Sequence, residues 1–215
     1  MIKIIKTSMV LLIAIVISAC QTTSPYDYSK LQVSKPRSIL VLPPMNDSVE
    51  VGAPYTFLST ISKPLAEKGY YVFPVAVIDT FMKENGLPTP AEMNSVPIAK
   101  LRDTIGADAV LYVHIHEWGQ SYQVLSSTAV TKAYMKLVDT RTGEILWDTT
   151  AFAQQQSGDG GGGLVGALVG ALVTQIMSDA VDHTPTLSAS ANDRAINDMN
   201  RGLLNGPYAR SGQSK

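Results

Sequence analysis

Short apolar runs alternate with helical spacings in the first half of the chain. Residues 38–42 and 70–73 are β-branched or aromatic runs that end at prolines, a pattern typical of buried strands. Between them, residues 56–68 have helical periodicity and end before a glycine. The apolar positions of this predicted helix are Phe57, Leu58, Ile61 and Leu65. A strand, helix, strand order with short connections predicts a parallel strand pair with the helix packed across it.

The second half of the chain predicts a meander followed by a helix. Gly143 occupies a position that suits a left-handed turn in the short connection 140–143. Residues 182–185 are predicted to break a helix, and residues 192–204 to form one with Ile196, Met199 and Leu203 on one face. The remaining predicted elements are helices at 77–85 and 97–105 and strands at 109–118, 128–139 and 144–154. The expected fold class is α/β, a mixed sheet sandwiched by helices, with an antiparallel hairpin and a C-terminal helical segment.

The first nineteen residues have the layout of a secretory signal peptide. Lys3 and Lys6 form a short basic segment, and an unbroken apolar stretch follows over residues 9–17. This stretch is well below the roughly 20 residues that a permanent membrane-spanning helix needs. Residues 1–19 are therefore predicted to direct export and to take no part in the fold.

The signal ends in a cysteine after two small residues. Ile17, Ser18, Ala19 and Cys20 resemble the lipobox that the bacterial lipoprotein signal peptidase recognises. That resemblance implies cleavage before Cys20, a thioether-linked diacylglycerol on its thiol and a further acyl chain on its amino group, together a stable anchor. Gln21 stands where inner-membrane lipoproteins typically have aspartate, so we expect an outer-membrane location. A secreted protein without lipid, whose signal happens to end in cysteine, is the alternative.

Composition favours a globular domain with a packed core. Hydrophobic residues make up 45% of the chain and charged residues 16%. Cys20 is the only cysteine, so neither an intramolecular disulfide nor thiol catalysis is expected. The net charge is −1, which gives no reason to expect a nucleic-acid partner.

The predicted organisation is a lipid-anchored single domain. Residues 20–36 are polar and proline-containing, without apolar periodicity, and are predicted to be an extended tether. Residues 37–207 are expected to form one α/β domain, and residues 208–215 a disordered tail.

Three sequence blocks resemble known envelope proteins. Residues 39–46, 106–112 and 137–147 are similar to a family of bacterial lipoproteins catalogued as domain of unknown function 799. The first and third blocks resemble, more weakly, the curli-secretion-channel lipoproteins and the amino-terminal domain of the Tol-system periplasmic protein. These blocks are strand and turn patterns, so the resemblance implies a fold and an envelope setting and transfers no active site. It also implies work in an envelope complex, with a curli-channel-like lipoprotein as a candidate partner.

Residues 158–182 form an unusual glycine-rich segment. Glycines recur every fourth residue beside a row of larger apolar residues, so on a helix they would form a groove for another backbone. A helix that is apolar nearly all round must be buried in its own core, in a partner or in lipid. Burial in the core, self-association and membrane insertion all remain open. The residues predicted to make contacts are Gly162, Val165, Gly166, Val169, Gly170, Leu172 and Ile176.

Candidate chemistry is sparse. His114 and His116 lie two apart on a predicted strand and therefore share a face, a geometry that metal sites use. Glu117 is expected on the other face, and no third ligand is placed by spacing, so neither a metal site nor a cofactor is predicted. Trp118 and Trp147 fit core packing, and the chain has no Gly-x-Ser-x-Gly nucleophile elbow and no complete P-loop.

We therefore expect a non-enzymatic outer-membrane lipoprotein that acts by protein–protein contact in envelope assembly or transport and self-associates. An activator of a cell-wall synthase is a related alternative. An alternative from a different class is a metal-dependent periplasmic enzyme that uses His114 and His116.

Overall fold

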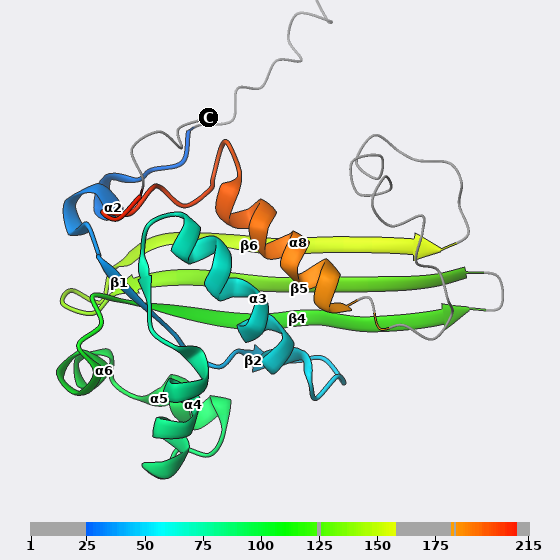
Figure 1. Cartoon of the computed structure of the whole chain (residues 1–215), viewed down its shortest axis with the longest axis horizontal. Helices are drawn as coiled ribbons and strands as arrows, with labels where there is room; N and C mark the ends of the chain where they lie inside the picture. Colours follow the sequence, from blue (N-terminus) through cyan, green and yellow to red (C-terminus); the bar gives the residue numbers. More distant parts are fainter. Residues whose placement is uncertain (1–24, 124–125, 158–181, 183, 210–215) are drawn as a thin grey trace, which may run out of the picture.

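The computed structural model describes residues 25–123, 126–157, 182 and 184–209 (Figure 1). These residues form helices packed on one sheet. The helices are α2 (Ser29–Ser34), α3 (Ala53–Glu67), α4 (Val75–Glu84), α5 (Pro90–Ser95), α6 (Ile98–Ile105) and α8 (Thr184–Asn197). The strands are β1 (Ser38–Val41), β2 (Met45–Asn46), β3 (Tyr71–Val72), β4 (Ala109–Gln123), β5 (Ser126–Asp139) and β6 (Ile145–Ser157).

The sheet is mixed, as predicted. Its order is β3-β1-β4-β5-β6, with β1 parallel to both β3 and β4, and with β4, β5 and β6 in an antiparallel meander. The short strand β2 pairs in parallel with β4 farther along the same edge that β1 uses. β4 therefore has β1 beside its beginning and β2 beside its middle. The α/β fold class with an antiparallel hairpin and a C-terminal helix is confirmed.

One face of the sheet is covered along the meander by α3 and α8, which contact each other (Figure 1). Alternate residues of the long strands point into this layer because side chains on a strand alternate between faces. On β4 these are Leu111, Val113 and Ile115, which meet Phe57 and Ile61 of α3. The helical positions predicted for α3 are all buried.

The opposite face is covered only near its parallel end. Leu40, Leu42 and Val110 point to this side and pack in a second cluster with residues of α4, α5 and α6, including Ile78 and Met93. Helix α5, which the sequence analysis missed, begins with a capping box in which Thr89 and Glu92 bond to each other's backbone N–H. Beyond these three short helices, no helix among the described residues covers the second face of the meander (Figure 1).

The segment before β1 differs from the extended tether that the sequence predicts. Residues Ser29–Ser34 form α2, whose Leu31 is buried in the main core. The Tyr28 hydroxyl donates a hydrogen bond of 2.6 Å to the carbonyl of Gly202, and Tyr26 stacks edge-on against Tyr28. Apolar periodicity could not reveal this segment because a six-residue helix buries only one of its residues.

The last helix lies earlier in the chain than predicted. Helix α8 begins at Thr184, where the Asp182 carboxylate accepts hydrogen bonds from the Thr184 N–H and hydroxyl. Thr184 and Pro185, which were predicted to lie in a helix break, are therefore the first two residues of this helix. The helix ends at Asn197. Beyond it the chain turns, because the Asp198 carboxylate accepts hydrogen bonds from the N–H groups of Asn200 and Arg201. Met199 is 98% exposed and was wrongly assigned to the buried face, whereas Ile196 and Leu203 are buried.

No helix in the described part of the chain is long and apolar enough to span a bilayer. The signal and lipobox residues, including Cys20 and Gln21, lie outside the described residues. So do the predicted contact residues of the glycine-rich segment, Gly162 to Ile176. The interpretations of both segments stay predictions.

The turn between β5 and β6 is organised by a buried carboxylate. Asp139 is 1% exposed and accepts hydrogen bonds from the N–H groups of Arg141 and Thr142, from the Arg141 guanidinium and from the Ser34 hydroxyl of α2. Gly143 has a φ of 74°, in the left-handed region, as predicted for this turn. Burial alone would raise the pKa of Asp139, but these donors outweigh it and lower the pKa to about 2.

We expect Asp139→Asn to lower the free energy of unfolding by about 2 kcal/mol at pH 6, because the folded pKa lies below the ordinary value near 3.8. A depressed pKa contributes stability above the unfolded value, and this stability is lost as the pH falls from about 4 through about 2. Urea unfolding at pH 6 and at pH 2.5 should show the penalty shrinking in acid. Asp103→Asn, a change at an exposed residue of α6, is the control and should alter stability by less than about 0.5 kcal/mol at either pH. A loss of stability in Asp139→Asn that is equal at both pH values would contradict the stabilising role of the ionised Asp139 carboxylate.

Candidate functional site

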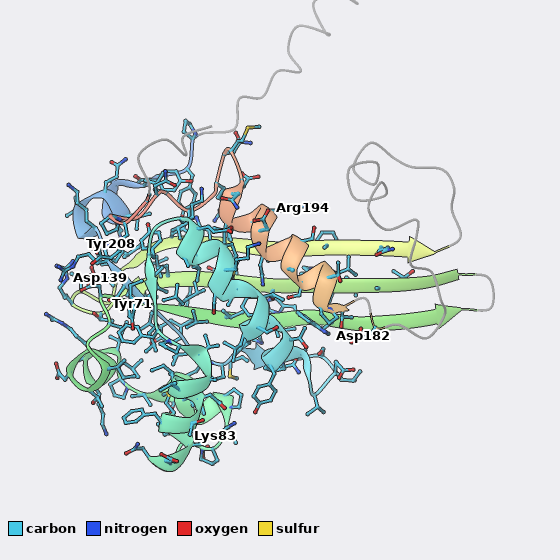
Figure 2. The ribbon with its side chains drawn as sticks, viewed as in Figure 1. Tyr71, Lys83, Asp139, Asp182, Arg194 and Tyr208 are labelled. Atoms are coloured by element: carbon cyan, nitrogen blue, oxygen red, sulfur yellow. The ribbon has the colours of Figure 1, made fainter. Side chains whose placement is uncertain are left out.

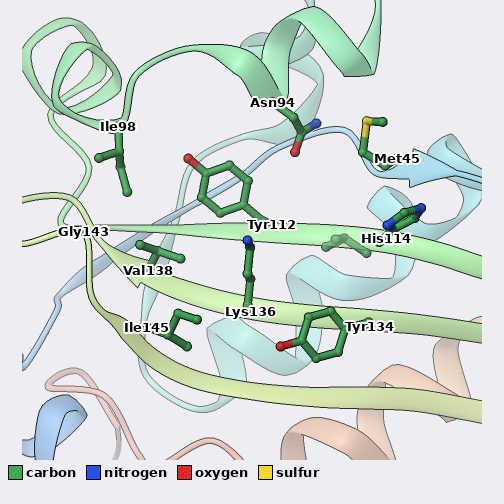
Figure 3. Close-up of a pocket in the computed structure, with 11 residues that line it drawn as sticks. Met45, Asn94, Ile98, Tyr112, His114, Tyr134, Lys136, Val138, Gly143 and Ile145 are labelled. Atoms are coloured by element: carbon green, nitrogen blue, oxygen red, sulfur yellow. The ribbon is translucent and has the colours of Figure 1, made fainter.

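A groove lies on the sheet face that α4, α5 and α6 leave uncovered (Figure 3). Its volume is about 670 Å³. The floor comes from β4, β5 and β6, and one wall comes from α5, the start of α6 and β2. Its lining residues are Met45, Asn94, Ile98, Tyr112, Val113, His114, Tyr134, Lys136, Val138, Gly143 and Ile145.

The middle of the groove combines aromatic rings with a cation. Lys136 rises from β5 between Tyr112 and Tyr134, and its ammonium lies 5.4 Å from the centroid of the Tyr112 ring (Figure 3). Burial raises the pKa of both tyrosines, and the Asp148 carboxylate near Tyr134 adds to that rise. Both phenols therefore stay protonated at neutral pH. The Tyr134 hydroxyl donates to the Asp148 carboxylate at 3.5 Å, and the Tyr112 hydroxyl offers a donor beside an apolar ring.

One end of the groove carries a cluster of three potential metal ligands. His114 and His116 lie side by side on β4, with ring centroids 4.6 Å apart and planes inclined by 31°. The Oδ2 atom of Asp47 is 2.8 Å from His114 Nε2 and 3.3 Å from His116 Nδ1. The sequence placed the two histidines on one face, and the structure adds the third group that spacing could not identify.

Asp47 reaches the histidines because β2 pairs with β4. The register places Met45 opposite His114 and Asn46 opposite Ile115, so the next residue, Asp47, comes level with His116. The Asp47 N–H donates a hydrogen bond of 2.9 Å to the carbonyl of Ile115, the residue between the two histidines. The position of this carboxylate therefore depends on a parallel strand pair of only two residues.

A β-bulge changes the expected direction of Glu117. The register of β4 against β5 shifts between Ile115 and Glu117, which leaves His116 as the extra residue and places Glu117 opposite Lys132. The two side chains form an ion pair of 2.8 Å. The prediction that Glu117 points to the face opposite the histidines is therefore wrong, because strict alternation fails at a bulge.

The charge of Asp47 is favoured by its neighbours. The imidazole of His114, and to a smaller extent that of His116, lowers the pKa of the Asp47 carboxyl below its ordinary value of 3.8. The carboxylate is thus ionised at neutral pH. An ionised carboxylate beside two imidazoles is a donor set that divalent transition metals accept.

The other candidate residues are structural. Trp118 and Trp147 are buried in the main core, and the Trp147 indole N–H donates a hydrogen bond of 2.8 Å to the carbonyl of Arg201. The prediction of core packing for both tryptophans is confirmed. Tyr112, Tyr134 and Lys136 were missed, although polar residues at alternate positions of two adjacent strands indicate a face that is not fully buried.

Comparisons with known proteins identify relatives of the chain. Residues 26–208 match the model of a family described as "Putative lipoprotein GNA1162-like". A protein of Neisseria meningitidis serogroup B (strain ATCC BAA-335 / MC58), named "Putative lipoprotein NMB1124/NMB1162", is 40% identical over 194 residues. That match covers 89% of this chain and 90% of the relative. These matches confirm the predicted relationship to a family of bacterial lipoproteins.

Two solved structures are also similar to this chain. The crystal structure of lipoprotein GNA1162 from Neisseria meningitidis is 43% identical, with a TM-score of 0.56 over 65% of this chain and 97% of that one. A dodecameric PelC from Paraburkholderia phytofirmans is 14% identical, with a TM-score of 0.48 over 80% of this chain and 91% of that one. The PelC similarity is too low to carry its assembly over to this chain.

Replacing His114 with glutamine is expected to raise the pKa of Asp47 toward 3.8, because the His114 imidazole is the largest cause of its depression. Carboxyl carbon shifts of Asp47, followed by NMR between pH 2 and 6, would measure the change. Arg194→Gln alters an exposed residue of α8 on the other side of the sheet and should leave the Asp47 titration as it is in the natural sequence. Equal Asp47 titrations in all three proteins would show that the carboxylate and His114 are not in contact.

Proposed function

Since the chain belongs to the GNA1162-like lipoprotein family, we propose that it is an outer-membrane lipoprotein that acts by protein–protein contact and self-associates. The observation that carries the proposal is the part of the meander face that no described helix covers, where Tyr112, Tyr134 and Lys136 line a groove of about 670 Å³. Tyrosine and methionine are enriched in protein interfaces, and Met45 also lines this groove. A second copy of the chain is the partner we propose, since closed homo-oligomers are the commonest assemblies of soluble domains.

Lipid on Cys20 would hold the domain close to the membrane. Tyr26 is already fixed to the body: its hydroxyl donates a hydrogen bond of 2.8 Å to Asp148, and the Arg201 guanidinium lies over its ring. Only residues 21–25 separate it from Cys20, and they can span no more than about 20 Å even when fully extended. The end of the sheet that carries α2 and the turn 140–143 would therefore face the lipid.

This short connection distinguishes between the alternatives. A synthase activator that reaches across the periplasm needs a long tether, whereas contact with neighbouring membrane-anchored copies does not.

The glycine-rich segment follows the end of β6, and that 13-residue strand runs roughly 40 Å away from the turn 140–143. We propose that Gly162, Gly166 and Gly170 lie at a second contact between copies, with Val165, Val169, Leu172 and Ile176 beside them. A curli-channel-like lipoprotein remains the proposed further partner in envelope assembly or transport.

The anchor is tested by two variants at adjacent residues. Cys20→Ser should block lipid attachment, so that metabolic labelling with a palmitate analogue is lost and the membrane fraction no longer contains a processed, lipid-modified chain. Gln21→Asp should keep the label but shift the protein from the outer-membrane to the inner-membrane fraction. Continued labelling of Cys20→Ser would exclude Cys20 as the acceptor, and an unchanged location of Gln21→Asp would remove the sorting argument.

The contact surface is tested by photo-crosslinking in cells. A benzophenone amino acid at Tyr134, within the groove, should yield a product of twice the chain's mass that contains only this protein. The same probe at Arg194, on the solvent side of α8 across the sheet, is the matched control and should yield no such product (Figure 2). Lys136→Glu should reduce crosslinking from Tyr134 by about tenfold by placing a charge without a complement in the interface.

Different outcomes of that experiment have different consequences. A Tyr134 product that contains another protein would keep the contact role of the groove and reject self-association through it. Equal products from Tyr134 and Arg194 would indicate crowding in the membrane, and no product from Tyr134 would reject the groove as a contact surface.

Self-association through the glycine-rich segment is tested separately. We expect the chain in detergent to have an oligomeric molar mass by light scattering, and we expect Gly166→Leu with Gly170→Leu to reduce it to the mass of a folded monomer, because leucine side chains fill the groove that close approach requires. Circular dichroism checks that the variant is folded. A monomeric natural chain would contradict self-association, and an unchanged oligomer in the variant would exclude the glycine positions from the contact.

A further inference from the structure

We propose that Asp47, His114 and His116 form a binding site for one divalent transition metal ion, of which Zn²⁺ fits the donors best. The site lies at the rim of the groove, because His114 belongs to both. Two imidazole nitrogens and one carboxylate oxygen are ligands that Zn²⁺ commonly takes in proteins, with a fourth position left for water or another donor.

The distances suit a metal of this size. With metal–ligand bonds of about 2.0–2.1 Å and tetrahedral angles, two ligand atoms lie roughly 3.3 Å apart. His116 Nδ1 and Asp47 Oδ2 are 3.3 Å apart, and His114 Nε2 and Asp47 Oδ2 are 2.8 Å apart. The three ligand atoms all lie within 4.8 Å of one another. Side-chain rotations that move these atoms by about 1 Å would bring them to the separations of a zinc site.

The backbone holds the ligands in place before any metal binds. The hydrogen bond from the Asp47 N–H to Ile115 ties the loop to β4 between the histidines. Asn46 closes the same loop, because its side chain accepts the N–H and hydroxyl of Ser48 and donates to the Glu50 carbonyl. The bulge at His116 is a local distortion of a kind that is common where a side chain must be aimed.

The contact between His114 and Asp47 is close but poorly aligned. His114 Nε2 is shielded from solvent, and the Asp47 Oδ2 atom near it, at 2.8 Å, does not lie in line for a good hydrogen bond. Shielded polar atoms in native structures usually have well-placed partners. A cation between His114 and Asp47 would satisfy the imidazole nitrogen and the carboxylate together.

The site would be open on one side. The side chains of His114, His116 and Asp47 are 40%, 42% and 56% exposed, and no fourth histidine, cysteine or carboxylate among the described residues joins the group. Glu117 is directed to Lys132 instead. A water molecule, or a donor from a protein that occupies the groove, would complete the coordination.

Zinc binding can be measured on the full chain in detergent. Cys20→Ser serves as the background protein, so that chains without lipid on Cys20 contribute no free thiol that competes for the metal. After treatment with a chelator, calorimetric titration with zinc should give about one ion per chain. Asp47→Asn and His116→Gln should each weaken binding by at least about tenfold, since each removes one of three ligands. Glu117→Gln is the control, because the Glu117 carboxylate is paired with Lys132, and this variant should bind zinc like the background protein.

A second readout identifies the ligands directly. Imidazole nitrogen signals of both His114 and His116 should shift as zinc is added. Circular dichroism of each variant separates loss of a ligand from loss of the fold. Equal losses of affinity in Glu117→Gln and Asp47→Asn would overturn the proposal. So would unmoved His114 and His116 signals at millimolar zinc, which would leave only an ion pair at this position.

Discussion

The buried carboxylate of Asp139 joins three parts of the chain at one end of the sheet. It closes the β5–β6 turn through backbone N–H groups and binds Arg141, and it also accepts the hydroxyl of Ser34 at the end of α2. Next to it, the Thr140 hydroxyl donates to the carbonyls of Ala107 and Asp108 just before β4. The start of β4, the hairpin and the segment that leads from the anchor therefore share one hydrogen-bonded junction. Because β4 and β5 pair over their whole length from this junction, their register depends on it.

That register determines both the core and the site. Leu111, Val113 and Ile115 pack under α3 and α8, while Tyr112 and His114, between them on the same strand, point to the groove. A slip of one residue would exchange these two sets and place histidine in the core. Stability and the candidate site are thus encoded by alternate residues of one strand, and the short helices α4 to α6 leave the second set partly uncovered.

Sequence patterns predicted the features that local interactions determine. The run 38–42, the helix over residues 56–68 and the turn at Gly143 each depend on nearby residues, and the structure contains all three. The missed features depend on contacts between distant residues or on single polar groups. The role of Asp47 requires that residues 45–46 pair with β4, and the direction of Glu117 requires a bulge. The beginning of α8 depends on one carboxylate, that of Asp182. Helix α5 is an exception among the missed features, because the capping pattern of Thr89 and Glu92 is local in the sequence.

The proposed contact role and the proposed metal site do not depend on each other, yet the groove and the histidine cluster lie next to each other. The groove and the cluster share His114, and both lie on the second face of β4, beyond the part that α4, α5 and α6 cover. An open coordination position at the rim of a groove favours a partner that brings a carboxylate or imidazole, because such a donor would replace water on the metal while its neighbours pack on Tyr112 and Tyr134. A metal used in this way would contribute to the affinity and specificity of the contact with the partner. Such a site would need no catalytic base beside its three ligands. Under both proposals, that arrangement would let a metal-binding cluster serve a lipoprotein that acts by contact.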